Sequence, residues 1–473
     1  MMAAKPGAPP RVVSDMTTFP SDHPRIIAPH SRREFIARSG KMAAASALAG
    51  VAIPHVHAAG DDTIRLALIG SGGRGSGAVV NAMEAPGSTA KLWAMADLYQ
   101  NRLRSAHAAL SAKLGDRFDV PSDRQFLGFD AFKAAIDTLR PGSGDVAMLT
   151  GYAGFRPQQL EYAVQKGVNV FMEKSFATDP PAVRRVIAAG EAAEKKGLKI
   201  AAGLMCRHSR NRQELIKRVQ DGELGEVLFT RAYRMGPSGP LAPKPAETPE
   251  LEWQIRNFTK FLWVSGGLYA EMDIHQIDEL CWIHDAWPAE AHGVGGRAAD
   301  STDCSQNLDS FSAEWTFPNG SKGYDVVRYI PKTYSEFATF IHGTKCAAQF
   351  SGNIHAGTVR IFKDQRIAPG NIAWQAPNET MTPYVAQWTD LLDAIRNNKP
   401  FNQAKRAALS NLADIMGRAA IHMGRIVTWD EAMASNFQFF ANTDHLTHES
   451  EAPLKADPQG RYPVPIPGAW IEI

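Results

Sequence analysis

The chain has 473 residues, enough for more than one domain and for a large buried core. Hydrophobic residues make up 44% of it, charged residues 21%, and the formal net charge is +2. This balance is typical of a soluble globular protein and leaves no basic field that would bind nucleic acid. The 4 cysteines form no CxxC pair, which disfavours a structural zinc site and a disulfide-rich scaffold but allows one disulfide.

The first 59 residues have the pattern of an export signal. Residues 31–36 (SRREFI) carry the twin-arginine pattern, and an apolar run follows over 42–53. That run is about half the length that crosses a bilayer, and small residues at 56–59 offer a cleavage site. We therefore expect a twin-arginine signal region over 1–59, the twin-arginine export machinery as a partner, and a periplasmic or otherwise exported location. A short uncleaved anchor is the alternative.

Residues 60–203 have the pattern of a parallel α/β sheet, here expected to be a Rossmann domain. Short apolar runs predict strands, and the amphipathic stretches between them predict helices. The expected strands cover residues 63–69, 90–96, 145–150, 168–172 and 199–203. The expected helices cover residues 75–83, 157–166 and 180–196.

The first strand runs directly into a glycine-rich loop, Gly70-Ser71-Gly72-Gly73-Arg74-Gly75. In this pattern Gly70 allows a tight turn, Gly72 lets a pyrophosphate approach the backbone, and Gly75 lets the next helix pack on the strand. The N-terminus of that helix offers free N–H groups to phosphates. The whole loop is therefore predicted to bind a dinucleotide, and a glycine-rich loop without a ligand is the alternative.

Other cofactor contacts are expected where later strands end. Asp97 closes the second strand and is placed to bind the ribose hydroxyls, which favours NAD. Arg102 and Arg104 follow soon after, so NADP stays the alternative. Thr150 and Glu173 end two further strands and complete the predicted cofactor set together with Lys174.

Candidate catalytic residues lie in two segments. Lys174 follows a strand at the edge where such sheets bind ligands, and a lysine there can polarise a substrate hydroxyl or carbonyl and move its proton. Glu271, His275 and Asp278 share one face of a predicted helix, so a carboxylate would lie beside an imidazole and tune it for proton transfer. We expect Lys174, His275 and Glu271 to be catalytic. A solvated lysine and a buried histidine are the structural alternatives, and a metal site would need ligands that the sequence does not show.

Candidate substrate-binding residues surround these segments. Arg207 and His208 end the strand that begins at Lys199, so they lie at the same edge and could bind substrate or pair with acids. Arg256 precedes the Gly266-Gly267 turn, where guanidinium donors suit a polyol. Together with Asp278 they form the predicted substrate set.

From about residue 225 the pattern changes to that of an antiparallel sheet. Apolar residues alternate with polar ones over 311–317, a turn follows at 318–320, and strands are expected over 324–329, 336–342 and 358–362. Apolar residues between 384 and 395 recur at helical spacing. We expect an α+β substrate and oligomerisation domain over 204–440, followed by a proline-rich tail over 441–473 that covers the surface or a partner subunit.

Together these segments resemble the glucose–fructose oxidoreductase, inositol dehydrogenase and MocA (Gfo/Idh/MocA) family over about residues 63–433. The motifs that carry the resemblance are the loop at 70–75, Asp97, the segment 172–174 and the block 266–278. The resemblance implies a Rossmann domain followed by a large, mainly antiparallel sheet whose open face supports homo-oligomers. It also implies that Lys174 is the catalytic lysine, that His275 is the acid/base histidine, and that the cofactor is held tightly.

The chain departs from the family pattern at four positions. Ser175 replaces a proline, Arg156 lies where many members have a histidine, Asp273 replaces a common glycine, and Glu271 replaces a common aspartate. The resemblance implies an NAD(P)-dependent oxidoreductase that acts on a hydroxyl or carbonyl of a sugar, polyol or cyclitol. The alternatives are an NAD-dependent glycoside hydrolase or lyase that uses a transient oxidation, and a non-catalytic dinucleotide-binding sensor or scaffold.

Overall fold

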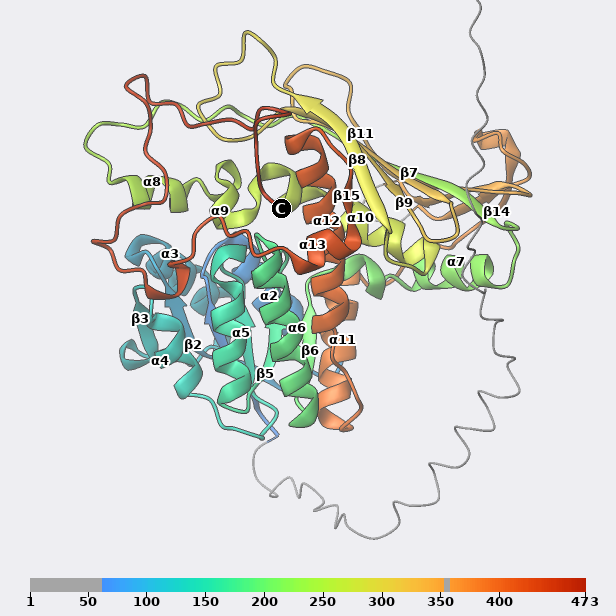
Figure 1. The fold of residues 1–473 in the computed structure, drawn as a ribbon. Coiled ribbons are helices and arrows are strands. Elements are labelled where there is room, and N and C mark those ends of the chain that lie inside the picture. The colour runs from blue at the N-terminus through green and yellow to red at the C-terminus, as the bar shows by residue number, and fades with distance from the viewer. Residues whose placement is uncertain (1–61, 353–357) are drawn as a thin grey trace, which may run out of the picture. The chain divides into compact units, whose positions relative to one another are not determined.

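Two β-sheets organise the residues that the computed structural model describes, 62–352 and 358–473 (Figure 1). The first sheet has six parallel strands, and the second has nine strands that pair mostly antiparallel. This confirms the predicted fold class. The predicted export signal over 1–59 lies outside the described residues. Within the described part of the chain, no helix is both long enough and apolar enough to cross a membrane.

The first sheet has the strand order β3-β2-β1-β4-β5-β6. Its strands are β1 (Ile64–Ile69), β2 (Ala90–Asp97), β3 (Gln125–Leu127), β4 (Val146–Leu149), β5 (Asn169–Met172) and β6 (Ile200–Ala202). The chain builds outward from β1 to β3 on one side and from β4 to β6 on the other. The order therefore reverses between β1 and β4, and ligands bind beyond the carboxyl ends of strands at such a point.

Helices cover both faces of the first sheet, which explains why β4 and β5 are buried along their whole length. Those that follow its strands are α2 (Gly73–Glu84), α3 (Gln100–Leu114), α4 (Ala131–Asp137), α5 (Arg156–Gln165) and α6 (Pro180–Lys195). A later helix, α11 (Pro383–Arg396), packs on the same sheet as α2 and α3, and its Trp388 ring stacks on Phe171 of β5 with centroids 4.5 Å apart. The apolar spacing predicted this helix but did not show which sheet it covers.

The second sheet has the strand order β14-β13-β12-β11-β7-β10-β9-β8-β15, and only β7 and β10 pair parallel. Its strands are β7 (Val227–Met235), β8 (Glu290–Gly296), β9 (Ser310–Thr316), β10 (Lys322–Arg328), β11 (Glu336–Gly343), β12 (Ala347–Ser351), β13 (Arg360–Phe362), β14 (Ile372–Gln375) and β15 (Val427–Thr428). Burial alternates along β9 and β10, as their sequence pattern predicts. The strand expected over 358–362 is shorter and begins at Arg360.

Helices α10 (Gly267–His284) and α12 (Ala404–Met423) cover the buried face of the second sheet. Trp315 of β9 is fully buried there and donates its indole N–H to the carbonyl of Ala413 at 3.0 Å. A Cβ at Gly417 would overlap the Trp315 ring, so only glycine fits at that point of α12. The remaining helices are α7 (Arg210–Gln220), α8 (Glu250–Arg256), α9 (Leu262–Ser265) and α13 (Trp429–Ala434).

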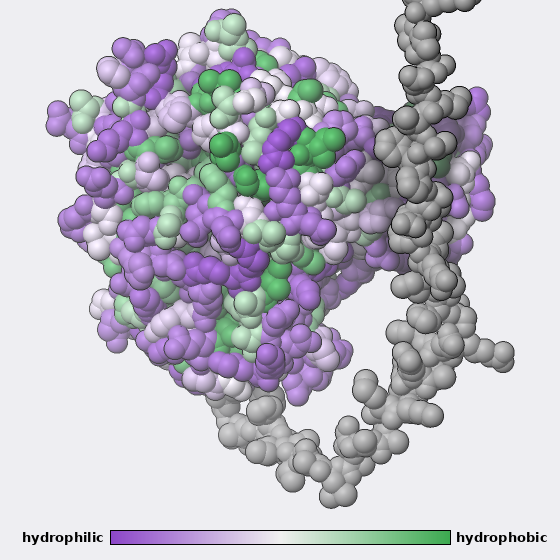
Figure 2. Space-filling model, in the orientation of Figure 1, coloured by the Kyte–Doolittle hydropathy of each residue, from purple (hydrophilic) through white to green (hydrophobic). Residues whose placement is uncertain are grey.

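The tail over 441–473 packs on its own chain. Tyr462 is buried and donates its hydroxyl to Glu250 of α8 at 2.7 Å. Glu472 is fully buried and pairs with Arg418 and His422 of α12, each at 2.9 Å. The four cysteines are buried and lie in no disulfide, so the disulfide that the sequence allowed is not formed. Figure 2 shows hydrophilic side chains over most of this side of the molecule, with small apolar patches between them.

Candidate active site

The loop between β1 and α2 lies at the carboxyl edge of the first sheet. Gly70 has a φ of +94°, and a Cβ there would lie 2.6 Å from the backbone nitrogen of Gly151. A Cβ at Gly75 would overlap the carbonyl oxygen of Gly70. By contrast, no atom of the described residues lies within 4 Å of a Cβ built at Gly72 or Gly73. The fold itself therefore requires two of the glycines, and the other two face open space where a ligand could approach the backbone.

Helix α2 begins in this loop. No side chain of the described residues caps its N-terminus, so the backbone N–H groups of the first turn point toward the loop. Such groups, together with the helix dipole, favour a bound anion. Loop and helix together have the geometry of a pyrophosphate-binding site, and the residues present fit a dinucleotide.

Asp97 ends β2 and contacts the same loop. Its Oδ2 accepts a hydrogen bond from the backbone N–H of Ser71 at 2.7 Å, and its Oδ1 accepts one from that of Tyr99 at 2.9 Å. Burial raises the pKa of Asp97, while the two backbone donors and the Arg102 guanidinium oppose that rise. Each carboxylate oxygen keeps a lone pair, to which a ribose hydroxyl could donate.

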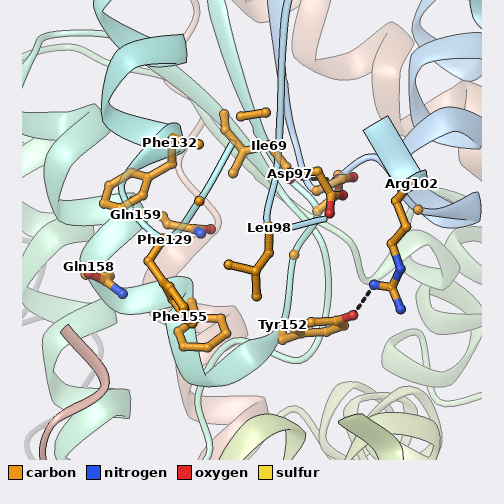
Figure 3. A pocket seen from close by; sticks show the side chains of 17 residues that line it. Ile69, Asp97, Leu98, Arg102, Phe129, Phe132, Tyr152, Phe155, Gln158 and Gln159 are labelled. Carbon is orange, nitrogen blue, oxygen red and sulfur yellow. Dashed lines mark hydrogen bonds between the residues drawn. The ribbon is translucent and has the colours of Figure 1, made fainter. Parts of the chain in front are cut away.

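An apolar slot of about 100 Å³ opens beside Asp97 (Figure 3). Its walls are the side chains of Ile69, Leu98, Phe129, Phe132 and Phe155, with the amides of Gln158 and Gln159. In Figure 3 the rings of Phe129 and Phe132 lie at the end opposite Asp97 and Arg102. Apolar walls with a few amide groups suit a flat heteroaromatic base, with its ribose directed to Asp97.

A larger cleft of about 760 Å³ adjoins the slot, and the two share Gly72, Arg102, Thr150, Gly151 and Tyr152. Its remaining wall includes the glycine-rich loop and the side chains of Glu173, Lys174, Phe258 and Glu271. All ten residues predicted to bind the cofactor line the slot or the cleft. An apolar slot joined to a larger polar cleft could hold both halves of a dinucleotide.

Lys174 and Glu271 meet in the wall of the cleft. The Lys174 Nζ donates to Glu271 Oε1 at 2.6 Å and also to the backbone carbonyl of Glu271. The two side chains are 16% and 12% exposed, so the pair is shielded but can be reached from the cleft. Glu173 is held separately, because its carboxylate pairs with Arg74 at 2.9 Å. The structure thus joins two of the three predicted catalytic residues across β5 and α10.

His275, the third predicted catalytic residue, lies one turn after Glu271 on α10 and is 8% exposed. In the described part of the chain it is not among the side chains that line the cleft. Asp273 lies between the two along α10 and is fully buried, and its Oδ2 accepts a hydrogen bond from Tyr329. The carboxylate of Asp273 therefore faces the core.

Two of the predicted substrate-binding residues, Arg207 and Asp278, form an ion pair with each other. Arg207 Nε lies 2.8 Å from Asp278 Oδ2, and Asp278 also contacts Arg406 at 3.3 Å and Ser410 at 2.6 Å. Burial alone would raise the pKa of Asp278, but Arg207 and Arg406 hold it below its usual value. These charges are neutralised inside the protein and do not line the cleft in its described part.

The other two predicted substrate-binding residues are also paired within the chain. His208 Nδ1 lies 2.6 Å from Asp390 of α11, and the histidine is buried. Arg256 pairs with Glu252 one turn earlier on α8 at 2.6 Å, and its guanidinium lies 3.8 Å from the ring centroid of Tyr99. Neither lines the described cleft, so the structure brings none of the four predicted substrate residues to it.

Arg156, where the family pattern has a histidine, supports the end of β4 from inside. It is fully buried and donates to the carbonyl of Leu149 and, at 2.6 Å, to that of Gly151. Burial lowers its pKa to about 10, while Glu173 and Glu271 act in the opposite direction. Its role in the structure is to hold the backbone of the loop that lines both slot and cleft.

Sequence reasoning missed Tyr152 and Phe258, which line the cleft. Tyr152 comes two residues after Thr150, so its place at the end of a predicted strand was a usable signal. Phe258 lies in the 3₁₀ turn η5 (Phe258–Lys260), between α8 and α9. Nothing in its local sequence shows that this turn reaches back to the first sheet.

No protein-family model matches the sequence, and no curated protein is significantly similar to it. Among solved structures, scyllo-inositol dehydrogenase from Lactobacillus casei, with bound NAD(H) and scyllo-inositol, has a TM-score of 0.56 at 19% identity, covering 77% of this chain and 99% of that chain. Aldose–aldose oxidoreductase from Caulobacter crescentus, complexed with glycerol, has a TM-score of 0.60 at 18% identity, with coverages of 77% and 99%. UDP-N-acetylglucosamine 3-dehydrogenase from Acidithiobacillus ferrooxidans has a TM-score of 0.54 at 17% identity, with coverages of 79% and 99%. Likeness at these identities shows the fold, and the chain has the fold of the Gfo/Idh/MocA-type dehydrogenases.

Proposed function

We propose that the protein is an NAD-dependent oxidoreductase of the Gfo/Idh/MocA family that acts on a hydroxyl or carbonyl of a sugar, polyol or cyclitol. The observation that carries this proposal is the Lys174–Glu271 pair, which lies in the wall of the same cleft as the glycine-rich loop. A loop of this geometry on its own fits any dinucleotide-binding protein. A shielded lysine in the wall of the cleft adds a group that can act on a substrate oxygen.

The cofactor-binding residues divide into three groups. The loop and the N-terminus of α2 would hold the pyrophosphate, Asp97 the adenosine ribose, and the apolar slot the adenine. Asp97 supports NAD over NADP, because its carboxylate would repel a 2′-phosphate. When bound, the nicotinamide supplies the hydride acceptor or donor.

The chain's own residues would then handle the proton. As an ammonium, Lys174 Nζ can donate a proton to the oxygen of a carbonyl substrate that is being reduced, and as a neutral amine it can take the proton of a hydroxyl substrate that is being oxidised. Glu271 fixes the position of that ammonium through its contact at 2.6 Å and balances its charge. His275, one turn further along α10, is the candidate to exchange the proton with its surroundings.

The substrate class is supported by the three dehydrogenases that share the fold, which act on or bind polyhydroxylated molecules: an inositol, aldoses and a nucleotide sugar. We propose the same broad class here. The outcome could be a net oxidation, or a transient oxidation that cleaves a glycoside, and product analysis separates these two.

We further propose that the protein is exported through the twin-arginine route and holds its cofactor tightly. The support is the SRREFI motif at 31–36, because this route carries folded proteins and free NAD is scarce outside the inner membrane. We also propose that it assembles into homo-oligomers through the outer face of the second sheet, where Phe229, Tyr233 and Tyr324 are only partly buried.

The first test is to purify the full chain without added nucleotide, denature it, and identify any released dinucleotide by mass spectrometry. The proposal expects about one NAD(H) per chain, followed by turnover on a panel of sugars, polyols and glycosides. If no nucleotide is released and added NAD does not bind, the oxidoreductase proposal fails.

A further inference from the structure

The side chains of Arg102 and Tyr152 line both the slot and the cleft. Arg102 is in the first turn of α3, which follows β2, whereas Tyr152 is in the loop after β4. In the strand order these two strands flank β1 and the glycine-rich loop. The two side chains therefore reach toward each other from opposite sides of that loop.

Arg102 and Tyr152 are joined by a hydrogen bond, which Figure 3 shows as a dashed line. The guanidinium Nη1 donates to the phenol oxygen of Tyr152. Burial raises the pKa of Tyr152, so the phenol stays neutral at physiological pH and can accept this bond. Both side chains are only partly buried, so a rotation of either one can break the contact.

A third side chain closes the other face of Tyr152. The ring of Phe258 stacks on that of Tyr152 with centroids 4.6 Å apart and an interplanar angle of 27°. The backbone of Phe258 is fixed, because its carbonyl accepts a hydrogen bond from Ser265 Oγ at 2.8 Å, and the carbonyl of Thr259 accepts one from Asn307 at 2.9 Å. Phe258 is thus the anchored end of a chain of contacts that runs through Tyr152 to Arg102, hereafter the Arg102–Tyr152–Phe258 bridge.

The bridge crosses the place where the adenosine slot joins the cleft that contains Lys174. A dinucleotide that occupies both cavities has to pass this place when it enters and when it leaves. The contacts of the bridge join protein side chains. Breaking them therefore costs the same free energy when the dinucleotide enters as when it leaves. A contact made to the dinucleotide would instead slow only its departure.

We propose that the Arg102–Tyr152–Phe258 bridge is the gate that sets the exchange rate of the dinucleotide, with Phe258 and Tyr152 as its retaining residues. This inference rests on the proposed function, since it assumes that the cleft binds NAD. Slow exchange would let the exported protein keep its NAD in a compartment where lost NAD cannot be replaced. The gate also adds a determinant of the cofactor exchange rate outside the glycine-rich loop and Asp97.

The test is stopped-flow fluorescence with NADH and the full-length purified protein, freed of nucleotide. Association is followed directly, and dissociation is followed by displacement with excess NAD. The variants are Phe258→Ala, which removes the anchored ring, and Tyr152→Phe, which keeps the stack but removes the hydrogen bond to Arg102. Loss of a ring stack, or of a single hydrogen bond, should increase the fraction of molecules in which the gate is open by about three- to tenfold. Each variant should raise both the association and the dissociation rate by about that factor and leave Kd within about twofold of wild type.

Two contacts outside the slot and the cleft offer controls. The rings of Trp287 and Trp429 stack with centroids 5.9 Å apart, and Tyr162 donates its hydroxyl to Asp137 at 2.9 Å. Trp429→Ala and Tyr162→Phe therefore remove a ring stack and a hydrogen bond away from the slot and the cleft. Neither should alter the exchange rates.

The outcomes separate the two proposals. Wild-type protein that binds no NADH or NAD overturns the proposed function and the gate with it. Wild-type protein that binds NADH, with both bridge variants exchanging it at the wild-type rate, overturns the gate alone. A faster dissociation with unchanged association also overturns the gate, because it would make Phe258 and Tyr152 ordinary ligand contacts. If Phe258→Ala does not fold, the Tyr152→Phe result decides.

Discussion

Three carboxylates buried beneath the site should make the stability of the protein fall as pH rises. Asp273 of α10, Asp325 of β10 and Asp414 of α12 are each fully buried. Both oxygens of Asp414 and one of Asp273 have no hydrogen-bond partner among the described residues. No group of three or more His, Cys, Asp or Glu side chains within 62–352 and 358–473 is arranged to hold a metal ion. Such groups avoid burying their charge by keeping a proton.

The sign of the pH effect follows from the pKa values. Burial raises the pKa of Asp273 to about 7 and that of Asp414 to about 8, although Arg234 and Lys174 oppose the first shift and Arg418 and Lys174 the second. Near neutral pH the folded protein therefore binds more protons than the unfolded chain, in which an aspartate has its ordinary pKa of 3.8. The contribution of Asp273 and Asp414 to the stability is greatest below pH 3.8 and falls as the pH rises toward 7 and 8.

Asp273→Asn tests this reasoning, because asparagine keeps the shape and can still accept the hydrogen bond from Tyr329. For Asp273, each pH unit between 3.8 and about 7 costs about 1.4 kcal/mol, which amounts to about 4 kcal/mol for full ionisation. At pH 5, about 1.2 units above 3.8, the variant should already be more stable than the wild type by about 2 kcal/mol. At pH 8.5 it should be more stable by up to about 4 kcal/mol, because it has no charge to bury.

The assay is urea denaturation of the full-length protein at pH 5 and pH 8.5, followed by tryptophan fluorescence. Asp278→Asn is the matched control, since Asp278 is equally buried but its pKa is lowered by Arg207 and Arg406. It is ionised and paired at both pH values, so its replacement should destabilise the protein by a similar amount at each. If Asp273→Asn behaves like this control, Asp273 is ionised in the folded protein and the reasoning is refuted.

Three further predictions concern the site and its supports. Lys174→Met should lower kcat at least a hundredfold while NADH binding, measured by fluorescence titration, stays within a few-fold of wild type; unchanged turnover would show that Lys174 is not the catalytic lysine. Asp97→Ser should remove the repulsion of a 2′-phosphate and shift the ratio of the NADP to the NAD dissociation constants at least tenfold toward NADP, as measured by calorimetry. Glu472→Ala leaves the buried Arg418 and His422 without their carboxylate, so urea denaturation should show a loss of about 3–5 kcal/mol, whereas a loss under 1 kcal/mol would mean that the tail does not stabilise α12.

The cofactor side of the site could be predicted because its chemistry is local. The loop from Gly70 to Gly75 follows a strand and precedes a helix, and this order of elements can be read from neighbouring residues of the sequence. Asp97 and Lys174 could be placed because parallel strands end at one edge of their sheet. The same rule reaches Tyr152, which was overlooked only because its residue type suggested no chemistry.

The substrate side could not be predicted because its partners are distant in sequence. Arg207 and Asp278 are 71 positions apart, and His208 and Asp390 are 182 apart. A charged residue near a predicted site can bind a ligand or neutralise another charge, and only the fold shows which. The same holds for α11, because its apolar face showed that the helix is buried but not that it packs on the first sheet.

The geometry of α10 explains how a carboxylate at 273 can be tolerated next to the Lys174–Glu271 pair. Successive residues of a helix are turned by about 100°, so Asp273 lies about 200° around the axis from Glu271, whereas His275 returns to within about 40° of it. Glu271 thus faces Lys174 and the cleft, while Asp273 faces Tyr329 and the core beneath the second sheet. The carboxylate at 273 therefore makes none of the contacts that line the cleft. It interacts with Lys174 through the electrostatic field, which lowers the pKa of Asp273 against the rise that burial causes.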